Sequence, residues 1–79
     1  MVPAPEEDVA TGVHCNLDRL LADRGLTLAR LSELVGVSVV NLSVLKNDRA
    51  KAIRFSTLTA ICRVLDCTVG ELLELDDAR

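Results

Sequence analysis

The sequence is almost without aromatic residues: among 79 residues Phe55 is the only aromatic one, and Trp and Tyr are absent. A core must therefore be aliphatic, and the chain supplies 14 Leu, 10 Val and 2 Ile. No apolar run approaches the ~18 residues that a membrane-spanning helix needs. With 49% hydrophobic and 27% charged residues, the chain is too apolar to be disordered. These features predict one small soluble domain, because so short a chain has no room for a second core.

An excess of positive charge is also missing. The formal net charge is −3 and the sequence pI is about 4.9, whereas nucleic-acid-binding domains typically have a pI above ~9. The charge is unevenly distributed, however. Residues 39–63 hold five cations and one carboxylate, a net of +4, while residues 1–38 carry −3 and residues 64–79 carry −4. Because the local field governs the approach to phosphate groups, the basic segment remains a candidate for binding nucleic acid.

The cysteines do not suggest disulfides, because Cys15, Cys62 and Cys67 are an odd number and the first residues lack the features of a signal peptide. We therefore expect free thiols and a cytoplasmic protein. Neighbouring side chains such as His14 and Cys15 diverge on an extended chain, so we expect no metal site. The single histidine also lacks a grouping of acid, base and nucleophile. We expect no enzyme activity and no cofactor.

Apolar spacing and capping residues divide the rest of the chain into helices. The first helix follows Asn16 as its cap and stops at Gly25, the second follows Thr27 and stops at Gly36, and the third runs over residues 38–46. The short, glycine-containing connection between the second and third helices is typical of a helix-turn-helix. Such a crossing requires a small residue at the contact, and Ser32 meets that requirement.

The second half of the chain begins with a polar loop at residues 46–51, after which Ile53 and Phe55 allow a short extended stretch. Ser56 is the expected cap of a fourth helix. The core-facing stripe of this helix has helical spacing and consists of Leu58, Ile61, Cys62 and Leu65.

A T-x-x-E capping box, Thr68 and Glu71, predicts a short fifth helix that contains Leu72, Leu73 and Leu75. The expected domain therefore spans residues 14–76. Residues 1–13, with two prolines and an acidic run, are expected to form a flexible tail, and residues 77–79 a disordered end.

Residues 31–38, read as L-S-E-L-V-G-V-S, together with Leu42, Leu45 and Asn47 resemble the helix-turn-helix of the Cro/repressor family, also called Xre-type regulators. The resemblance extends from residue 16 to residue 75 and fits a compact single-domain subgroup. It implies an all-α, lambda-repressor-like fold of five short helices, with the helix-turn-helix formed by the second and third. The function it implies is that of a sequence-specific, repressor-like transcriptional regulator without a cofactor.

The resemblance also implies that the helix at residues 38–46 lies in the DNA major groove. Its outer face then supplies the base contacts, which are Ser38, Val39, Val40, Asn41, Ser43 and Val44. Asn is suited to adenine, and a valine can pack on a thymine methyl. The implied phosphate contacts, which position the protein without reading sequence, are Thr27, Lys46, Asn47, Arg49, Lys51 and Arg54.

The sequence departs from the family pattern at four positions. Leu28 stands where many members have Gln, Asp48 replaces a common loop Gly, and Val39 and Val40 replace polar residues often used to read bases. An apolar outer face has a second interpretation, because Val39, Val40 and Val44 can belong to the core or to a protein interface. The alternative function is therefore a protein–protein interaction module, or an antitoxin-type partner, that binds DNA weakly or not at all.

A single groove helix reads only ~4–5 base pairs, so useful specificity implies a homodimer on a two-fold operator in double-stranded DNA. We expect its interface at the fifth helix and the chain ends, because leucines there exceed what a four-helix core needs. The interface residues would be Leu72, Leu73 and Leu75. A second protein partner remains open, whereas a membrane partner is not expected, because the amphipathic helices are short and lack a basic face.

Overall fold

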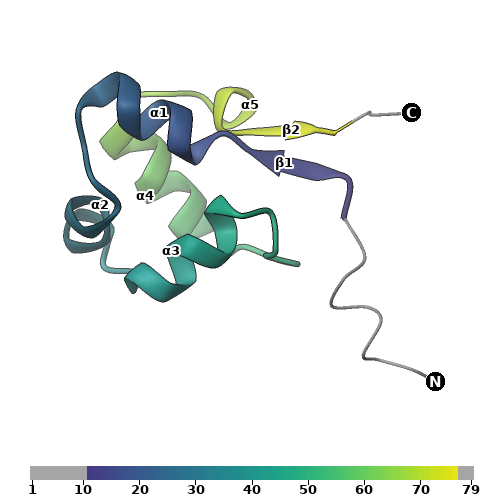
Figure 1. Cartoon of the computed structure of the whole chain (residues 1–79), viewed down its shortest axis with the longest axis horizontal. Helices are drawn as coiled ribbons and strands as arrows, with labels where there is room; N and C mark the ends of the chain where they lie inside the picture. The colour runs from purple at the N-terminus through teal and green to yellow at the C-terminus, as the bar shows by residue number, and fades with distance from the viewer. Residues whose placement is uncertain (1–10, 77–79) are drawn as a thin grey trace.

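The computed structural model describes residues 11–76, which form five helices and a two-stranded ribbon (Figure 1). In chain order the elements are β1 (Val13–Cys15), α1 (Leu17–Arg24), α2 (Leu28–Val35), α3 (Val39–Lys46), α4 (Phe55–Leu65), α5 (Val69–Leu72) and β2 (Leu73–Leu75). Most of the predicted tail and the whole predicted end at residues 77–79 lie outside the described residues. Val13, which we placed in the tail, belongs to β1.

Three of the predicted helix starts are confirmed by side-chain caps. The hydroxyls of Thr27 and Ser38 each accept a hydrogen bond from the backbone N–H three residues further on, at 3.0 and 3.1 Å. In the capping box, the Thr68 N–H donates to Glu71 Oε1 at 2.7 Å, and the Glu71 N–H donates to Thr68 Oγ1 at 3.1 Å. These bonds satisfy N–H groups that have no partner inside a helix.

The predicted side-chain cap at Asn16 is wrong, although α1 begins directly after it. The Asn16 backbone N–H donates to the Leu72 carbonyl at 2.8 Å, and its side-chain amide donates to the Glu71 carbonyl at 3.2 Å. Asn16 is buried, and a buried amide needs hydrogen-bond partners. It finds them on α5, so that this residue ties the two ends of the domain together.

The predicted start of α4 is also wrong. The helix begins at Phe55 with Arg54 as its N-cap, so Ser56 lies inside the first turn. The Leu58 N–H donates to the Arg54 carbonyl at 2.9 Å, which closes that turn two residues earlier than a cap at Ser56 would. The expected extended stretch does not form a strand: the backbone of Arg54 is extended, but Phe55 already belongs to α4. Phe55 is 84% exposed, so no burial of its ring favours a strand.

The fold is not all-α, because β1 and β2 pair antiparallel, with Val13 opposite Leu75 and Cys15 opposite Leu73. The helix predicted to include Leu73 and Leu75 ends at Leu72. Beyond it apolar and acidic residues alternate with the period of a strand. Cys15 and Leu73 therefore share one face of the ribbon, where Cys15 is buried and Leu73 is half-buried against the core.

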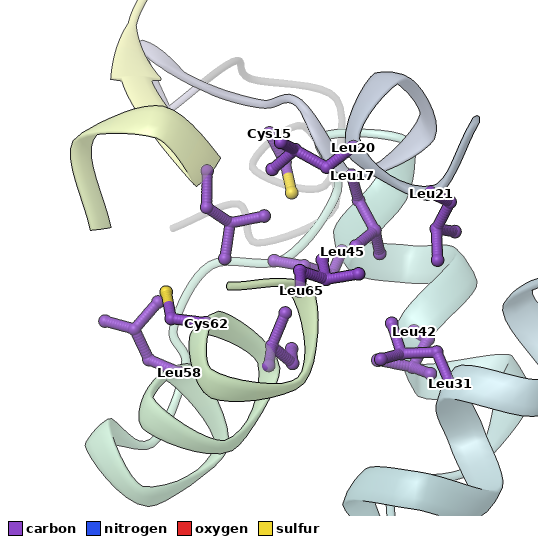
Figure 2. Packing of buried hydrophobic residues seen from close by; sticks show 12 residues of the cluster. Cys15, Leu17, Leu20, Leu21, Leu31, Leu42, Leu45, Leu58, Cys62 and Leu65 are labelled. Atoms are coloured by element: carbon purple, nitrogen blue, oxygen red, sulfur yellow. The ribbon is translucent and has the colours of Figure 1, made fainter. Parts of the chain in front are cut away.

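The core is aliphatic, as predicted, and lies between the helices and the base of the ribbon (Figure 2). The predicted stripe of α4 is buried in full. A fully buried leucine side chain stabilises a fold by about 1.5–3 kcal/mol. The buried cluster contains Cys15, Leu17, Leu20, Leu21, Leu31, Leu42, Leu45, Leu58, Ile61, Cys62, Leu65 and Leu72.

The C-terminal ends of α1 and α4 are joined by Arg24. Its Nε donates to the Leu65 carbonyl at 2.6 Å, and a terminal guanidinium nitrogen donates to the Asp66 carbonyl at 3.1 Å. The last carbonyls of a helix lack partners within it and carry partial negative charge. A cation at this position therefore stabilises the end of α4 and fixes α1 against it.

Candidate nucleic-acid interface

The chain turns sharply between α2 and α3, where its direction changes by 117°. Gly36 adopts a left-handed conformation with φ of 73°, and its N–H donates to the Ser32 carbonyl at 2.9 Å. The Ser32 hydroxyl donates to the Val37 carbonyl at 2.6 Å. The small residue expected at this crossing is therefore also a hydrogen-bond donor, and it fixes α3 relative to α2. Among residues 11–76 no single helix is long and apolar enough to cross a membrane, and α2 and α3 meet that test only as this bent pair.

α3 buries Leu42 and Leu45 and turns its other face to solvent. Val40 is 71% exposed, the most of its valines. Ser43 differs from the other predicted base contacts, because it is half-buried and its hydroxyl accepts a hydrogen bond from Asn47 Nδ2 at 3.3 Å. The remaining five are exposed together on this helix and its cap, and they are Ser38, Val39, Val40, Asn41 and Val44.

An open concavity of about 580 Å³ lies between α3 and the segment that follows it. It brings together two groups of predicted site residues: Ser38, Asn41 and Val44 from α3 and its cap, and Arg49, Lys51 and Arg54 from the connection to α4. All three cations are exposed. The concavity also includes residues that sequence reasoning did not single out for the site, namely Gly36, Val37, Leu42, Leu45, Ala50, Ala52, Ile53 and Thr57.

Lys46 and Thr27 are predicted phosphate contacts that already have a partner within the protomer. Lys46 lies 3.4 Å from an Asp18 carboxylate oxygen and is only 24% exposed at its side chain, so this ion pair directs it toward α1. The Thr27 hydroxyl is exposed but accepts the capping bond of α2. Asn47 is exposed at the C-terminal end of α3, and its amide retains one N–H beyond the bond to Ser43.

Asp48 connects the end of α3 to β1, a role that sequence reasoning missed. The residue has a left-handed φ of 63°, which explains why glycine is common at this position of the pattern. Its carboxylate accepts hydrogen bonds from the Cys15 N–H at 2.8 Å and from His14 Nδ1 at 2.7 Å. These bonds lower the pKa of Asp48, chiefly through the Cys15 N–H, and the bond to Asp48 raises the pKa of His14. The one sign of this role in the sequence was that the acidic residue Asp48 stands where the family pattern commonly has glycine.

The three residues predicted for a dimer interface are not equivalent. Leu72 is fully buried in the protomer core, which removes it from the surface that a partner can contact. Leu73 is half-buried against the same core. Leu75 is 79% exposed and is the one member of the set with a free apolar surface.

The cysteines are free thiols, as predicted. Burial raises the pKa of Cys15. It also raises the pKa of Cys67, to about 11, with a further contribution from the neighbouring Cys62. Over residues 11–76 no group of three or more His, Cys, Asp or Glu side chains is placed to hold a metal ion.

Comparison with known proteins matches residues 16–78 to the family model of the Cro/C1-type HTH DNA-binding domain. The chain is 54% identical over 59 residues to a protein of Bacillus subtilis (strain 168) named uncharacterized HTH-type transcriptional regulator YozG, covering 75% of this chain and 70% of that protein. It is also similar to a crystal structure of the transcriptional regulator VanUg, with a TM-score of 0.66, 35% identity, and coverage of 78% of this chain and 81% of that one. The family match extends over all five helices and β2 but leaves β1 outside.

Proposed function

The chain belongs to the family of Cro/C1-type helix-turn-helix DNA-binding domains and is a DNA-binding transcriptional regulator, and we propose that α2 and α3 form its helix-turn-helix. α3 enters the major groove, and α2 crosses the DNA backbone above it. The observation that carries this proposal is the concavity that combines the exposed face of α3 with Arg49, Lys51 and Arg54. Its cations supply the attraction for phosphate that the net charge of the chain lacks.

The exposed part of α3 and its N-cap contact the bases. These residues are Ser38, Val39, Val40, Asn41 and Val44. Asn41 carries the one amide among them and is the candidate for paired hydrogen bonds to an adenine. The valines contact thymine methyl groups. Ser43 has a smaller part than the sequence predicted, because the residue is half-buried and its hydroxyl already accepts a hydrogen bond from Asn47.

Phosphate contacts come from Arg49, Lys51, Arg54 and Asn47, with Thr27 at the start of α2 on the opposite side of the turn. Lys46 contributes less, because it must leave Asp18 to reach the DNA backbone. We extend the proposal to a repressor-like homodimer in the cytoplasm that binds an operator with two half-sites. This arrangement is supported by the small number of base pairs that one α3 can read.

Selection of bound fragments from random DNA by the purified protein tests the proposal. Enrichment of a sequence with two-fold symmetry supports it, and a failure to enrich any sequence would favour a protein-interaction module instead. If a dimer neutralises about six to eight phosphates, the logarithm of the binding constant should fall with the logarithm of salt concentration at a slope of roughly −5 to −7.

Three variants separate the roles within the interface. Arg54→Ala should weaken binding to all sequences alike and flatten the salt slope, because a phosphate contact carries no sequence information. Asn41→Ala should lose discrimination between operator and random DNA, with a smaller effect on nonspecific affinity. Arg63→Ala is the matched control, since Arg63 is an exposed arginine in the last turn of α4 outside the concavity. Wild-type binding by the first two variants would refute the assignment.

A further inference from the structure

The two edges of the β1–β2 ribbon differ in whether the backbone N–H and C=O groups that point away from the ribbon have hydrogen-bond partners. The Asp76 N–H donates to the Gly12 carbonyl at 2.7 Å, and the Asn16 N–H donates to the Leu72 carbonyl at 2.8 Å. Hydrogen-bonded and non-hydrogen-bonded pairs alternate along an antiparallel ladder. The backbone N–H and C=O groups of the pair Val13 and Leu75 therefore point away from the ribbon, as do those of Cys15 and Leu73.

The N–H groups on the outer edge of β1 are occupied by side chains of the same protomer. The Cys15 N–H donates to Asp48 Oδ1 at 2.8 Å, and the Val13 N–H donates to Thr11 Oγ1 at 3.2 Å. Proteins commonly block an edge strand in this way, because unpaired backbone groups attract another strand. β1 is therefore a poor site for strand addition.

The outer edge of β2 is open. The Leu73 N–H is used by the Val69 carbonyl, but within residues 11–76 the Leu75 N–H and the carbonyls of Leu73 and Leu75 have no hydrogen-bond partner. Figure 1 shows β2 at the rim of the molecule, with β1 along one side and no element along the other. The side chain of Leu75 is 79% exposed, and those of Val13 and Val69 are 39% and 50% exposed. Backbone groups and apolar surface are thus available at the same place.

We propose that this edge pairs with β2 of a second copy of the chain, antiparallel and about a two-fold axis at Leu75. The inference rests on the proposed homodimer and names its contact. The Leu75 residues of the two copies exchange two N–H···O bonds, which gives a four-stranded sheet with the two β2 strands at its centre. Because Val13 lies opposite Leu75 in each ribbon, two Val13 and two Leu75 side chains form one apolar row across all four strands. A self-complementary row of this kind is what a two-fold contact requires.

The acidic residues of β2 give the contact a distinctive salt dependence. With the axis at Leu75, Glu74 of one copy lies opposite Asp76 of the other, and like charges directly opposite each other oppose strand pairing. Salt screens this repulsion, so dimerisation should strengthen as salt rises. DNA binding should weaken over the same range. The two equilibria therefore respond to salt in opposite directions.

Sedimentation equilibrium of the full chain without DNA, at low and high salt, tests the contact. We expect a reversible dimer whose association constant rises with salt. Leu75→Asp should lower that constant by about tenfold or more, and Leu75→Pro should do the same because it removes the outward N–H but no bond of the internal ladder. Leu34→Asp is the control, since Leu34 is 45% exposed on α2, away from the ribbon. Circular dichroism establishes that each variant retains its helices.

The outcomes separate this contact from the proposed function. A dimer that persists in both Leu75 variants, or a wild-type chain that stays monomeric at high salt and high concentration, would overturn the contact and leave DNA binding by the protomer intact. Capture of a basic extended peptide by a monomeric wild-type chain would also overturn it. If Leu75→Asp keeps its affinity for random DNA but loses tight binding to a two-half-site operator, both proposals are supported. A Leu75-dependent dimer that binds no DNA would refute the function alone.

Discussion

Removal of the Asp48 side chain would separate the contributions of backbone conformation and hydrogen bonding at the end of α3. Asp48 combines a left-handed φ of 63° with a carboxylate that accepts bonds from His14 and Cys15. Asp48→Ala keeps the unfavourable backbone conformation and removes both acceptors. Asp48→Gly removes the acceptors but tolerates the conformation. Asp48→Asn keeps an acceptor oxygen and tolerates the conformation.

The hydrogen bond from the buried Cys15 N–H to Asp48 determines how much stability the variants should lose. Cys15 is 4% exposed, so loss of the acceptor leaves a backbone N–H unsatisfied at a cost of about 1–3 kcal/mol. Alanine in the left-handed region adds roughly 1–2 kcal/mol. We therefore expect the stability order wild type, Asp48→Asn, Asp48→Gly, Asp48→Ala. For a domain of this size, the alanine variant should unfold at a temperature lower by about 10 °C or more.

The effect should also depend on pH. Because the bond to Asp48 raises the pKa of His14 above its ordinary value of 6.5, the contribution of His14 is complete below pH 6.5 and is lost as pH rises through the raised pKa. Because the Cys15 N–H and then His14 lower the pKa of Asp48 below its ordinary value of 3.8, the carboxylate contributes above pH 3.8 and is lost as pH falls through the lowered pKa. The difference in unfolding free energy between wild type and Asp48→Ala should therefore be largest between pH 3.8 and pH 6.5, the ordinary pKa values of the two groups.

Thermal and urea unfolding followed by far-ultraviolet circular dichroism provide the assay, since the chain has no Trp. His14→Gln in the wild-type background is the control, because it should remove the pH dependence above pH 6 while the Cys15 bond to Asp48 remains. An alanine variant at least as stable as the glycine variant, or a stability difference that stays constant from pH 5 to pH 8, would refute the reasoning.

Three further predictions concern the contacts that position the helices. Arg24→Met should lower the free energy of unfolding by about 1–2 kcal/mol in urea titrations, because the last carbonyls of α4 lose a charged donor. Arg19→Met, at an exposed arginine of the same helix α1, should have little effect. Ser32→Ala should cost about 1 kcal/mol and also weaken DNA binding in a filter assay, because α3 is then less firmly oriented; unchanged affinity would contradict this. Thr68→Val should cost about 1 kcal/mol through loss of the capping box, and an equal loss in Thr59→Val, within α4, would assign the effect to helix propensity instead.

The helix starts and stops that were predicted correctly depend on residues close together in sequence. The hydroxyl caps at Thr27, Ser38 and Thr68 each reach a backbone N–H three residues away, and the left-handed Gly36 directly ends α2. The exposed face of α3 follows from the helical period once its buried leucines are known. Local chemistry therefore suffices for the helices and for most of the candidate interface.

The features that were missed depend on residues far apart in sequence. Asn16 bonds to α5 rather than capping its own helix, and Lys46 pairs with Asp18 rather than projecting freely. The two strands are three residues each, and each is too short to show a clear period alone. Their pairing becomes favourable only when the helices bring the ends together. The bond from β1 to Asp48 has the same origin, because it forms only when the strand lies beside the end of α3.

The hydrogen bond between Gly12 and Asp76 makes the described chain an almost closed ring. Its two ends leave the domain side by side at the tip of the ribbon, so the order of elements along the chain is only weakly tied to their arrangement in space. A short linker could join the ends, and new ends could be opened in an exposed connection without changing the packing of the helices. Conversely, a bulky domain fused directly to residue 11 or to residue 76 would emerge next to the open edge of β2, so its effect on self-association would not depend on which of the two positions carries it.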